Sequence, residues 1–280
     1  MKKGINIWSF GSGKTVRECM QLAKAAGFDG IELALAECGE LSLESSEQAF
    51  RDAKREAEEI GLEVASLACG LYWDYSFTSK DKAKRDQAFE IAKRQLAYAE
   101  ALGVDTILVV PGAVGVDFIP GSEVVDYDLA YHYALEAFVK LAAIAEQHRV
   151  HIGLENVWNK FLLSPLEFRD FIDKIDSNYI GAYLDVGNVV YAGYPEHWIK
   201  ILNKRIRKVH FKDYRRAAGG LHGFVDLLAG DVDYPAVMGQ LQAIGYDDYV
   251  TAEMIPPYRD YPDQIIYNTS KAMDCILGRK

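Results

Sequence analysis

The chain is poor in cysteine, and its four cysteines are scattered: Cys19, Cys38, Cys69 and Cys275. No two of them form a C-x-x-C pair, so the sequence lacks the usual zinc-knuckle spacing and gives no sign of a disulfide framework. Unpaired thiols of this kind are typical of proteins from a reducing compartment. We therefore expect a cytoplasmic protein whose thiols are free.

Long apolar runs are also missing. Asn6, Gly11 and Gly13 interrupt the apolar residues near the N-terminus, so we expect neither a signal peptide nor a membrane span. Basic residues are outnumbered, with 31 Lys and Arg against 41 Asp and Glu and a formal net charge of −10. Because such a surface repels polyanions, we expect neither nucleic acid nor an anionic membrane as a partner.

What the chain does have is a regular alternation of apolar strand patterns and amphipathic helix patterns. Strands are predicted at residues 4–10, 30–35, 64–68, 106–110, 152–154, 180–184, 208–209 and 249–252. Helices are predicted at residues 15–26, 46–60, 84–102, 127–148, 166–175, 194–206, 234–244 and 263–277. Gly27 and Gly103 are expected to end two of these helices, and Ser164-Pro165 to start another.

Eight strand-then-helix units account for the sequence without a linker or a low-complexity tract. This order predicts a parallel α/β sheet covered by helices, either an open doubly wound sheet or a closed barrel. We favour a (β/α)8 TIM barrel that forms a single domain over residues 1–280, because the units number eight and polar groups follow many strands. The connection 113–126 predicts a lid or pocket wall, 211–233 a substantial loop, and Pro256-Pro257 a turn.

Four consecutive strands in the second half of the chain lead into side chains that can bind a metal ion. These side chains are Glu155, Asp185, His210 and Glu253. Parallel strands of a barrel present their ends on one face, so the four groups are expected to converge there. Three carboxylates and one imidazole suit Mn²⁺, Mg²⁺ or Co²⁺ better than a thiolate-bound structural zinc. Taken singly, each residue is equally consistent with a solvated strand end or a core ion pair.

The segment Gly11-Ser-Gly-Lys-Thr15 is similar to the end of a phosphate-binding P-loop. The full pattern requires a glycine at position 8, where this chain has Trp8. The backbone cradle for a phosphate is therefore incomplete, and we interpret the segment as a loop that leads into a helix.

The chain carries four motifs at the predicted strand ends: Gly-Leu-Glu-Asn at 153–156, Leu-Asp-Val-Gly-Asn at 184–188, Val-His-Phe-Lys-Asp at 209–213 and Thr-Ala-Glu-Met at 251–254. These motifs resemble those of the xylose-isomerase-like sugar phosphate isomerases and epimerases, in particular the ketose 3-epimerases of the tagatose/psicose type and the L-xylulose-5-phosphate 3-epimerases. The resemblance extends over the whole chain. It implies a barrel that binds one divalent metal ion, with Mn²⁺ first and Mg²⁺, Co²⁺ or Zn²⁺ as alternatives. The implied ligands are Glu155, Asp185, His210 and Glu253.

The same resemblance implies that Glu155 and Glu253 are catalytic. Inversion of a carbon beside a ketone removes a proton from one face and adds one to the other, which requires two proton carriers. We therefore predict a metal-dependent isomerase or epimerase that acts on a ketose or ketose phosphate through a cis-enediolate. Two alternatives stay open. One is a dehydratase of the inosose type or an aldose–ketose isomerase of the hydroxypyruvate type with the same metal site; the other is a non-catalytic sugar-binding barrel.

Five further residues are candidates for contact with the sugar: Asn188, Lys212, Arg216, Trp158 and Trp8. Asn188 stands where the tagatose/psicose epimerases have a histidine and the phosphate-using epimerases have an asparagine, which favours a phosphorylated sugar. Lys212 and Arg216 belong to a basic cluster that could hold a phosphate or sugar hydroxyls, or lie in a solvated loop. The two tryptophans could form an apolar wall against the sugar, or pack at the rim of the site. The sequence is consistent with a monomer and with a homo-oligomer.

Overall fold

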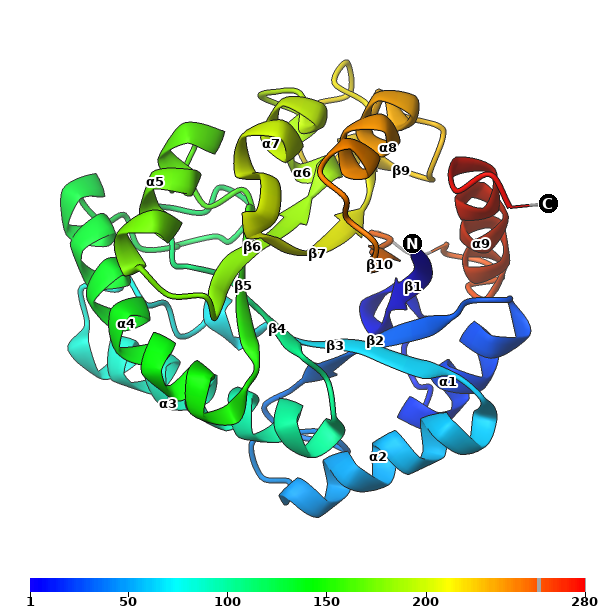
Figure 1. The fold of residues 1–280 in the computed structure, drawn as a ribbon, viewed down its shortest axis with the longest axis horizontal. Coiled ribbons are helices and arrows are strands. Elements are labelled where there is room, and N and C mark those ends of the chain that lie inside the picture. The colour runs from blue at the N-terminus through cyan, green and yellow to red at the C-terminus, as the bar shows by residue number, and fades with distance from the viewer. Residues whose placement is uncertain (256–257, 280) are drawn as a thin grey trace.

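The computed structural model describes residues 1–255 and 258–279, and in them eight parallel strands close into a barrel (Figure 1). In their order around the barrel the strands are β1 (Lys2–Asn6), β10 (Tyr249–Ala252), β7 (Ile206–Phe211), β6 (Ile180–Asp185), β5 (His151–Glu155), β4 (Thr106–Val109), β3 (Glu63–Cys69) and β2 (Gly30–Leu35). The barrel closes where β1 pairs with β10, in a register that aligns Lys2 with Tyr249. The predicted (β/α)8 fold is thereby confirmed, and the open sheet is excluded. The predicted turn at Pro256-Pro257 lies outside the described residues.

Helices surround the barrel and form its outer layer (Figure 1). They are α1 (Val16–Ala25), α2 (Glu47–Ile60), α3 (Lys82–Leu102), α4 (Tyr127–His148), α5 (Pro165–Ile175), α7 (Pro195–Leu202), α8 (Tyr234–Ala243) and α9 (Gln264–Ile276). Each of these helices corresponds to one predicted from the sequence. A short further helix, α6 (Val186–Val190), extends the C-terminal end of β6 and was not predicted.

Several helix boundaries follow from local capping chemistry. Thr15 and Glu18 form a capping box at the start of α1, in which each side chain accepts a hydrogen bond from the backbone N–H of the other residue. Ser164 caps α5 ahead of Pro165 at the first helical position, as predicted. Gly103 ends α3 with a φ of 79°, a left-handed conformation that glycine adopts without strain.

Two predicted boundaries differ from the structure by four residues, and the others by two or fewer. The first strand ends at Asn6 rather than at residue 10, because the Asn6 side chain accepts a hydrogen bond from the Trp8 N–H and starts the 3-10 turn η1 (Ile7–Ser9). The helix predicted at 194–206 ends at Leu202. Asn203 turns the chain there with a φ of 50°, and Ile206 then begins β7.

The core fills the barrel and the space between the barrel and the helices. All six residues of β6 are buried, which explains why this strand is a continuous apolar run rather than an alternating pattern. Within the barrel, however, several polar side chains are fully buried: Glu32, Ser66 and His210. Because buried polar groups need hydrogen-bond partners, this polar layer must be internally satisfied or must face a ligand.

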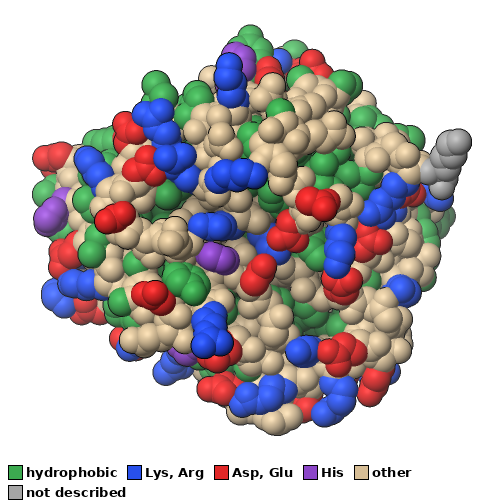
Figure 2. Space-filling view, viewed as in Figure 1, with side chains coloured by type: hydrophobic (Ala, Val, Ile, Leu, Met, Phe, Trp, Pro, Cys, Tyr) green, Lys and Arg blue, Asp and Glu red, His purple; other side chains and the backbone are tan. Residues whose placement is uncertain are grey.

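The surface carries charges of both signs. Figure 2 shows Lys and Arg side chains interspersed with Asp and Glu over the face seen along the barrel. Some of them form ion pairs within a helix, such as Arg51 with Glu47 at 2.7 Å, and exposed pairs of this kind contribute little stability each.

Among the helices of residues 1–255 and 258–279, none combines the length and the apolar character needed to cross a membrane.

Gly181 in β6 lies where a side chain has no room, because a Cβ atom there would clash with the carbonyl oxygen of Arg205 and the side chain of Arg207. We expect Gly181→Ala to lower the free energy of unfolding by about 1–3 kcal/mol, since the neighbouring backbone must shift. The matched control is Gly239→Ala in α8, where nothing lies within 4 Å of the added atom. That change should be neutral or stabilise by up to about 1 kcal/mol. Chemical denaturation measures both, and equal losses would contradict this packing of β6 on β7.

Candidate metal centre

Four side chains from neighbouring strands converge at the C-terminal end of the barrel. Glu155 and Asp185 are the last residues of β5 and β6, His210 lies in β7, and Glu253 follows β10 directly. The pairing of β6 with β7 aligns Asp185 with His210. All four are buried, with Glu155 and Glu253 the most exposed at 5%. One ligand atom from each residue lies within 4.8 Å of the others, so the structure brings together the predicted set.

The Nδ1 atom of His210 lies among the three carboxylates. It is 3.1 Å from Glu253 Oε2, 3.4 Å from Glu155 Oε1 and 3.9 Å from Asp185 Oδ2. His210 Nδ1 and Asp185 Oδ2 are both buried, and within the described part of the chain neither makes a contact with hydrogen-bond geometry. Their polar neighbours are ion-pair contacts, with the carboxylates around Nδ1 and with Lys212 Nζ at 3.0 Å from Oδ2. Buried atoms without a well-formed hydrogen bond require an explanation, and a cation between them would supply it. The donor set also fits a divalent ion that prefers oxygen and imidazole ligands.

On its other side, His210 contacts a residue that sequence reasoning missed. Its Nε2 atom lies 2.7 Å from the Oε1 atom of Glu32, which is fully buried in β2. Glu32 also accepts hydrogen bonds from the side chains of Asn6, Ser66 and Tyr183. The signal was present in the sequence, because a carboxylate inside the apolar strand GIELAL must have a buried partner.

Lys212, predicted as a substrate contact, lies within the carboxylate cluster. Its Nζ atom is 2.7 Å from Glu253 Oε2 and 3.0 Å from Asp185 Oδ2, and the side chain is buried. A buried ammonium needs anionic partners, and here two of the four proposed ligands provide them. The lysine therefore offsets part of the negative charge of the site.

Burial and neighbouring charges push the pKa values of the two glutamates apart. Burial raises the pKa of Glu155 to about 7, and the charge of Glu253 adds to this effect, while the neighbouring His210 ring and the Lys212 ammonium oppose it. Burial also acts on Glu253, but the Lys212 ammonium and the His210 ring outweigh it and lower the pKa of Glu253 to about 2. Two carboxyl groups whose pKa values differ in this way suit one proton donor and one proton acceptor.

Two asparagines hold the Asp185 segment in place. The Asn156 side chain donates to the Asp185 carbonyl oxygen and accepts from the Asp185 N–H, each at 2.9 Å. Asn188 donates its own N–H to Asp185 Oδ1 at 2.8 Å, so that Asp185 caps the short helix α6. The Asn188 side chain donates to the Asn156 carbonyl oxygen at 3.0 Å. Asn188, a predicted substrate contact, thus lies one hydrogen bond from the cluster.

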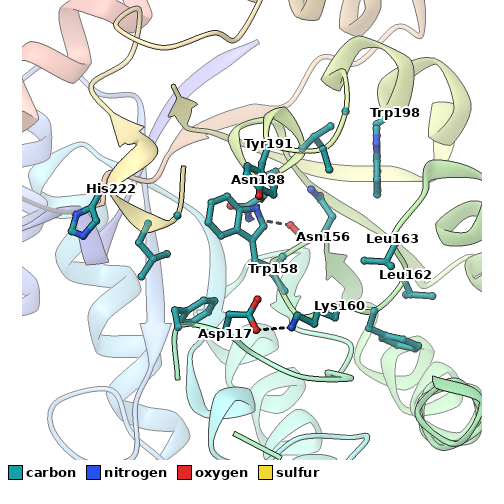
Figure 3. Close-up of a pocket in the computed structure, with 18 residues that line it drawn as sticks. Asp117, Asn156, Trp158, Lys160, Leu162, Leu163, Asn188, Tyr191, Trp198 and His222 are labelled. Atoms are coloured by element: carbon teal, nitrogen blue, oxygen red, sulfur yellow. Dashed lines mark hydrogen bonds and ion pairs between the residues drawn. The ribbon is translucent and has the colours of Figure 1, made fainter. Parts of the chain in front are cut away.

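A cavity of about 610 Å³ lies beside these asparagines (Figure 3). Figure 3 shows Trp158 in its middle, and the indole Nε1 of this residue donates to the Asn188 carbonyl oxygen at 3.0 Å. The wall also includes Tyr191, Trp198 and Leu163. Trp158 therefore lines an apolar cavity, and its contact with a sugar stays a prediction.

Two other predicted substrate contacts lie outside this wall. Arg216 donates through Nε to the Val190 carbonyl oxygen at 2.8 Å, and its guanidinium lies 5.3 Å from the ring centre of Tyr194. Trp8 is 38% exposed and approaches Gly70 at the start of η2 (Leu71–Trp73). Neither residue contacts the carboxylate cluster in the hydrogen bonds and ion pairs of the described residues.

The loop 211–233 is more ordered than its sequence suggested. It contains a hairpin of β8 (Asp213–Tyr214) and β9 (Phe224–Val225). The Asp213 carboxylate accepts four backbone N–H hydrogen bonds, from Tyr214, Leu228, Gly230 and Val232. One buried carboxylate therefore fastens the loop that follows His210 directly.

A barrel with three carboxylates and one imidazole buried at the C-terminal ends of its strands defines the structural class of this protein. The model of the xylose isomerase-like TIM barrel family matches residues 20–271, and the chain belongs to this family. The resemblance seen in the strand-end motifs is thereby confirmed.

Several known proteins are similar to this chain. A Haemophilus influenzae protein provisionally named L-ribulose-5-phosphate 3-epimerase SgbU is 25% identical over 246 residues, which cover 86% of this chain and 84% of the relative. The L-ribulose-5-phosphate 3-epimerase UlaE of Escherichia coli is 23% identical over 287 residues, which cover 99% and 94%. The crystal structure of D-psicose 3-epimerase with D-tagatose from Clostridium cellulolyticum H10 matches with a TM-score of 0.81 at 17% identity over 99% of each chain. This last likeness shows the shared fold.

The four hydrogen bonds to Asp213 generate a prediction about the loop. Asp213→Ala removes all four acceptor contacts, so we expect residues 214–233 to be cleaved by a protease at least about tenfold faster than in the wild type. The matched control is Asp231→Ala, which removes a single contact, the one from the Arg216 N–H at 2.8 Å. Limited proteolysis followed by mass spectrometry measures the two rates. Equal cleavage of the two variants would show that Asp213 does not fasten the loop.

Proposed function

We propose that this chain is a divalent-metal-dependent epimerase or isomerase of a ketose or ketose phosphate, with Glu155 and Glu253 as proton carriers and residues 1–280 as one domain. The observation that carries the proposal is the convergence of four ligand-type side chains within 4.8 Å, two of which present buried atoms without a hydrogen-bond partner. The similarity to UlaE over 99% of this chain supports a sugar as the substrate class.

The residues that would hold the ion are Glu155, Asp185, His210 and Glu253. When bound, the ion supplies a Lewis acid that polarises the ketone and stabilises the negative charge that develops on it. Asn156 and Asn188 keep Asp185 in place through the hydrogen bonds described above. Lys212 keeps Glu253 ionised and offers a donor for a sugar hydroxyl.

The proton transfers are assigned to the two glutamates. β7, which carries His210, separates β10 from β6 and β5 in the barrel, so Glu253 and Glu155 reach the site from opposite sides of the imidazole. Glu253, with its lowered pKa, removes the proton from the carbon beside the ketone, and Glu155, with its raised pKa, delivers one to the opposite face. In the reverse direction the two residues exchange roles.

The remaining candidates are assigned to the rest of the sugar. Trp158 and Asn188 border the cavity beside the cluster, where they can pack against a sugar C–H face and bind a hydroxyl. Trp8 is kept as a rim contact. Arg216 is kept as a phosphate contact that must exchange its hydrogen bond to the Val190 carbonyl for one to the substrate.

The protein should bind about one divalent ion per chain. Asp185→Asn keeps the shape of the side chain but removes a charge, so we expect Mn²⁺ affinity to fall at least about tenfold. Asp231→Asn, in the loop after β7 and outside the cluster, should bind as the wild type does. In thermal unfolding, Mn²⁺ at 100 times its Kd should stabilise the wild type by about 2.7 kcal/mol. Absence of a site in calorimetric titration of the wild type would overturn the proposed metal centre.

Reaction in deuterated water tests the proton carriers. An epimerase of this kind should place solvent deuterium at the inverted carbon, both in the product and in recovered substrate. Glu155→Gln and Glu253→Gln should each reduce net epimerisation by about 100-fold or more, while exchange on one face persists in the variant that keeps the corresponding base. NMR of the products measures both. Retention of wild-type turnover in either variant would sink the two-glutamate assignment.

A substrate panel separates the remaining alternatives. It comprises pentuloses, hexuloses, their phosphates, hydroxypyruvate and inosose, each with Mn²⁺. Solvent deuterium at a terminal carbon of the product identifies an aldose–ketose isomerase. Irreversible loss of water from the substrate identifies a dehydratase. Sugar binding without turnover or exchange identifies a non-catalytic barrel and rejects the enzyme proposal.

A further inference from the structure

We infer that Glu32, which lies outside the proposed ligand set, positions His210 for metal binding through a buried hydrogen-bond network that crosses the barrel. The inference rests on the proposed metal site. It names a residue that contacts one of the proposed ligands, His210, without being a ligand itself. Glu32 is a positioning residue, because it contacts His210 and reaches neither the substrate nor the ion.

The network joins five strands of the barrel. Glu32 Oε1 accepts from His210 Nε2 at 2.7 Å and from the Asn6 side chain. Glu32 Oε2 accepts from the hydroxyl of Ser66 at 2.6 Å and from that of Tyr183. The two hydroxyls are themselves 3.0 Å apart. All five residues are fully buried, so water does not compete for these hydrogen bonds.

The donors in this network are determined by chemistry. An ionised carboxylate only accepts hydrogen bonds, so the His210 nitrogen that faces Glu32 must carry a proton. The Asn6 amide is oriented as well, because its Oδ1 atom accepts from the Trp8 N–H at 2.7 Å and leaves its Nδ2 atom to face Glu32. In the neutral imidazole, a proton on Nε2 leaves the lone pair on Nδ1. Nδ1 is the atom that points into the carboxylate cluster.

The network also restrains the ring. The Tyr183 ring packs beside the His210 imidazole, with 4.6 Å between ring centres, and its hydroxyl is held by Glu32. Rotation of the imidazole would break the Glu32 contact, and the packed tyrosine ring covers one side of the imidazole. A charged acceptor behind a metal-binding imidazole raises the basicity of the ligand and fixes its tautomer, and loss of such a partner typically costs 10–100-fold in metal affinity.

A structural role alone is the competing explanation, since a buried carboxylate with four donors also joins β1, β2, β3, β6 and β7. The two roles predict different effects of replacing Glu32. A structural role predicts loss of thermal stability without a specific loss of metal affinity. The positioning role predicts loss of affinity even in a variant that remains folded.

The test is calorimetric titration of metal-free protein with Mn²⁺. Glu32→Gln keeps the size of the side chain and one acceptor oxygen but removes the charge, so we expect the Kd to rise about 10–100-fold. Tyr72→Phe removes a buried hydroxyl outside the network, the donor to Gln95 at 2.6 Å, and its Kd should change by less than about threefold, whatever its melting temperature. Glu63→Gln, a solvent-exposed carboxylate at the start of β3, controls for the loss of one charge and should also change the Kd by less than about threefold.

A second measurement does not depend on any variant being stable. In protein labelled with ¹⁵N-histidine and loaded with Zn²⁺, the one ring whose signals respond to the metal should carry its proton on Nε2 and none on Nδ1. A proton on Nδ1 of that ring, or a folded Glu32→Gln variant with wild-type affinity, overturns the inference while the metal site stands. A wild type that binds no ion overturns the metal site and this inference together.

Discussion

The rest of the structure depends on the burial of four carboxylates inside the barrel and at the C-terminal ends of its strands. They belong to Glu32, Glu155, Asp185 and Glu253, none more than 5% exposed. An uncompensated carboxylate in such a place costs several kcal/mol, a large part of the net stability of a domain. Their ion-pair partners in the described chain are His210 and Lys212. With His210 neutral, as a metal ligand must be, one ammonium faces four carboxylates, and a divalent ion bound there would offset two of the three remaining negative charges.

The register of the barrel strands determines where these charges lie. In β10 paired with β7, Thr251 is aligned with His210, and Glu253 stands two residues further along. Alternate residues of a strand face the same side, so Glu253 continues on the side that Thr251 occupies. A slip of one residue would turn the acidic group toward the helices, away from His210 and Lys212. The strand register therefore determines where the acidic groups of the site lie, and the burial of these groups disfavours any other register.

Much of this arrangement could be predicted from the sequence, because a charge at the end of an apolar run is conspicuous. Glu155 and Asp185 stand out for that reason, and the parallel order of strands implies that their side chains meet. Glu32 was missed because it lies within a strand buried on both faces, where periodicity does not separate barrel interior from exterior. Lys212 and Arg216 looked equivalent in the sequence. Only the hairpin after β7 shows that one turns into the cluster and the other toward backbone carbonyls.

In the proposed function, the carboxylate cluster holds the reacting end of the substrate, and the cavity beside it holds the far end. The carboxylate cluster is carried by strands, whereas the cavity beside it is lined largely by loop residues and aromatic rings. The lysine in that wall, Lys160, is already paired with Asp117 at 2.5 Å. A phosphate bound there must compete with this ion pair, whereas an uncharged sugar face meets Trp158 and Tyr191 without displacing any charge. The wall therefore weighs against the phosphorylated sugar that the Asn188 motif favours, and the carboxylate cluster suits either substrate equally.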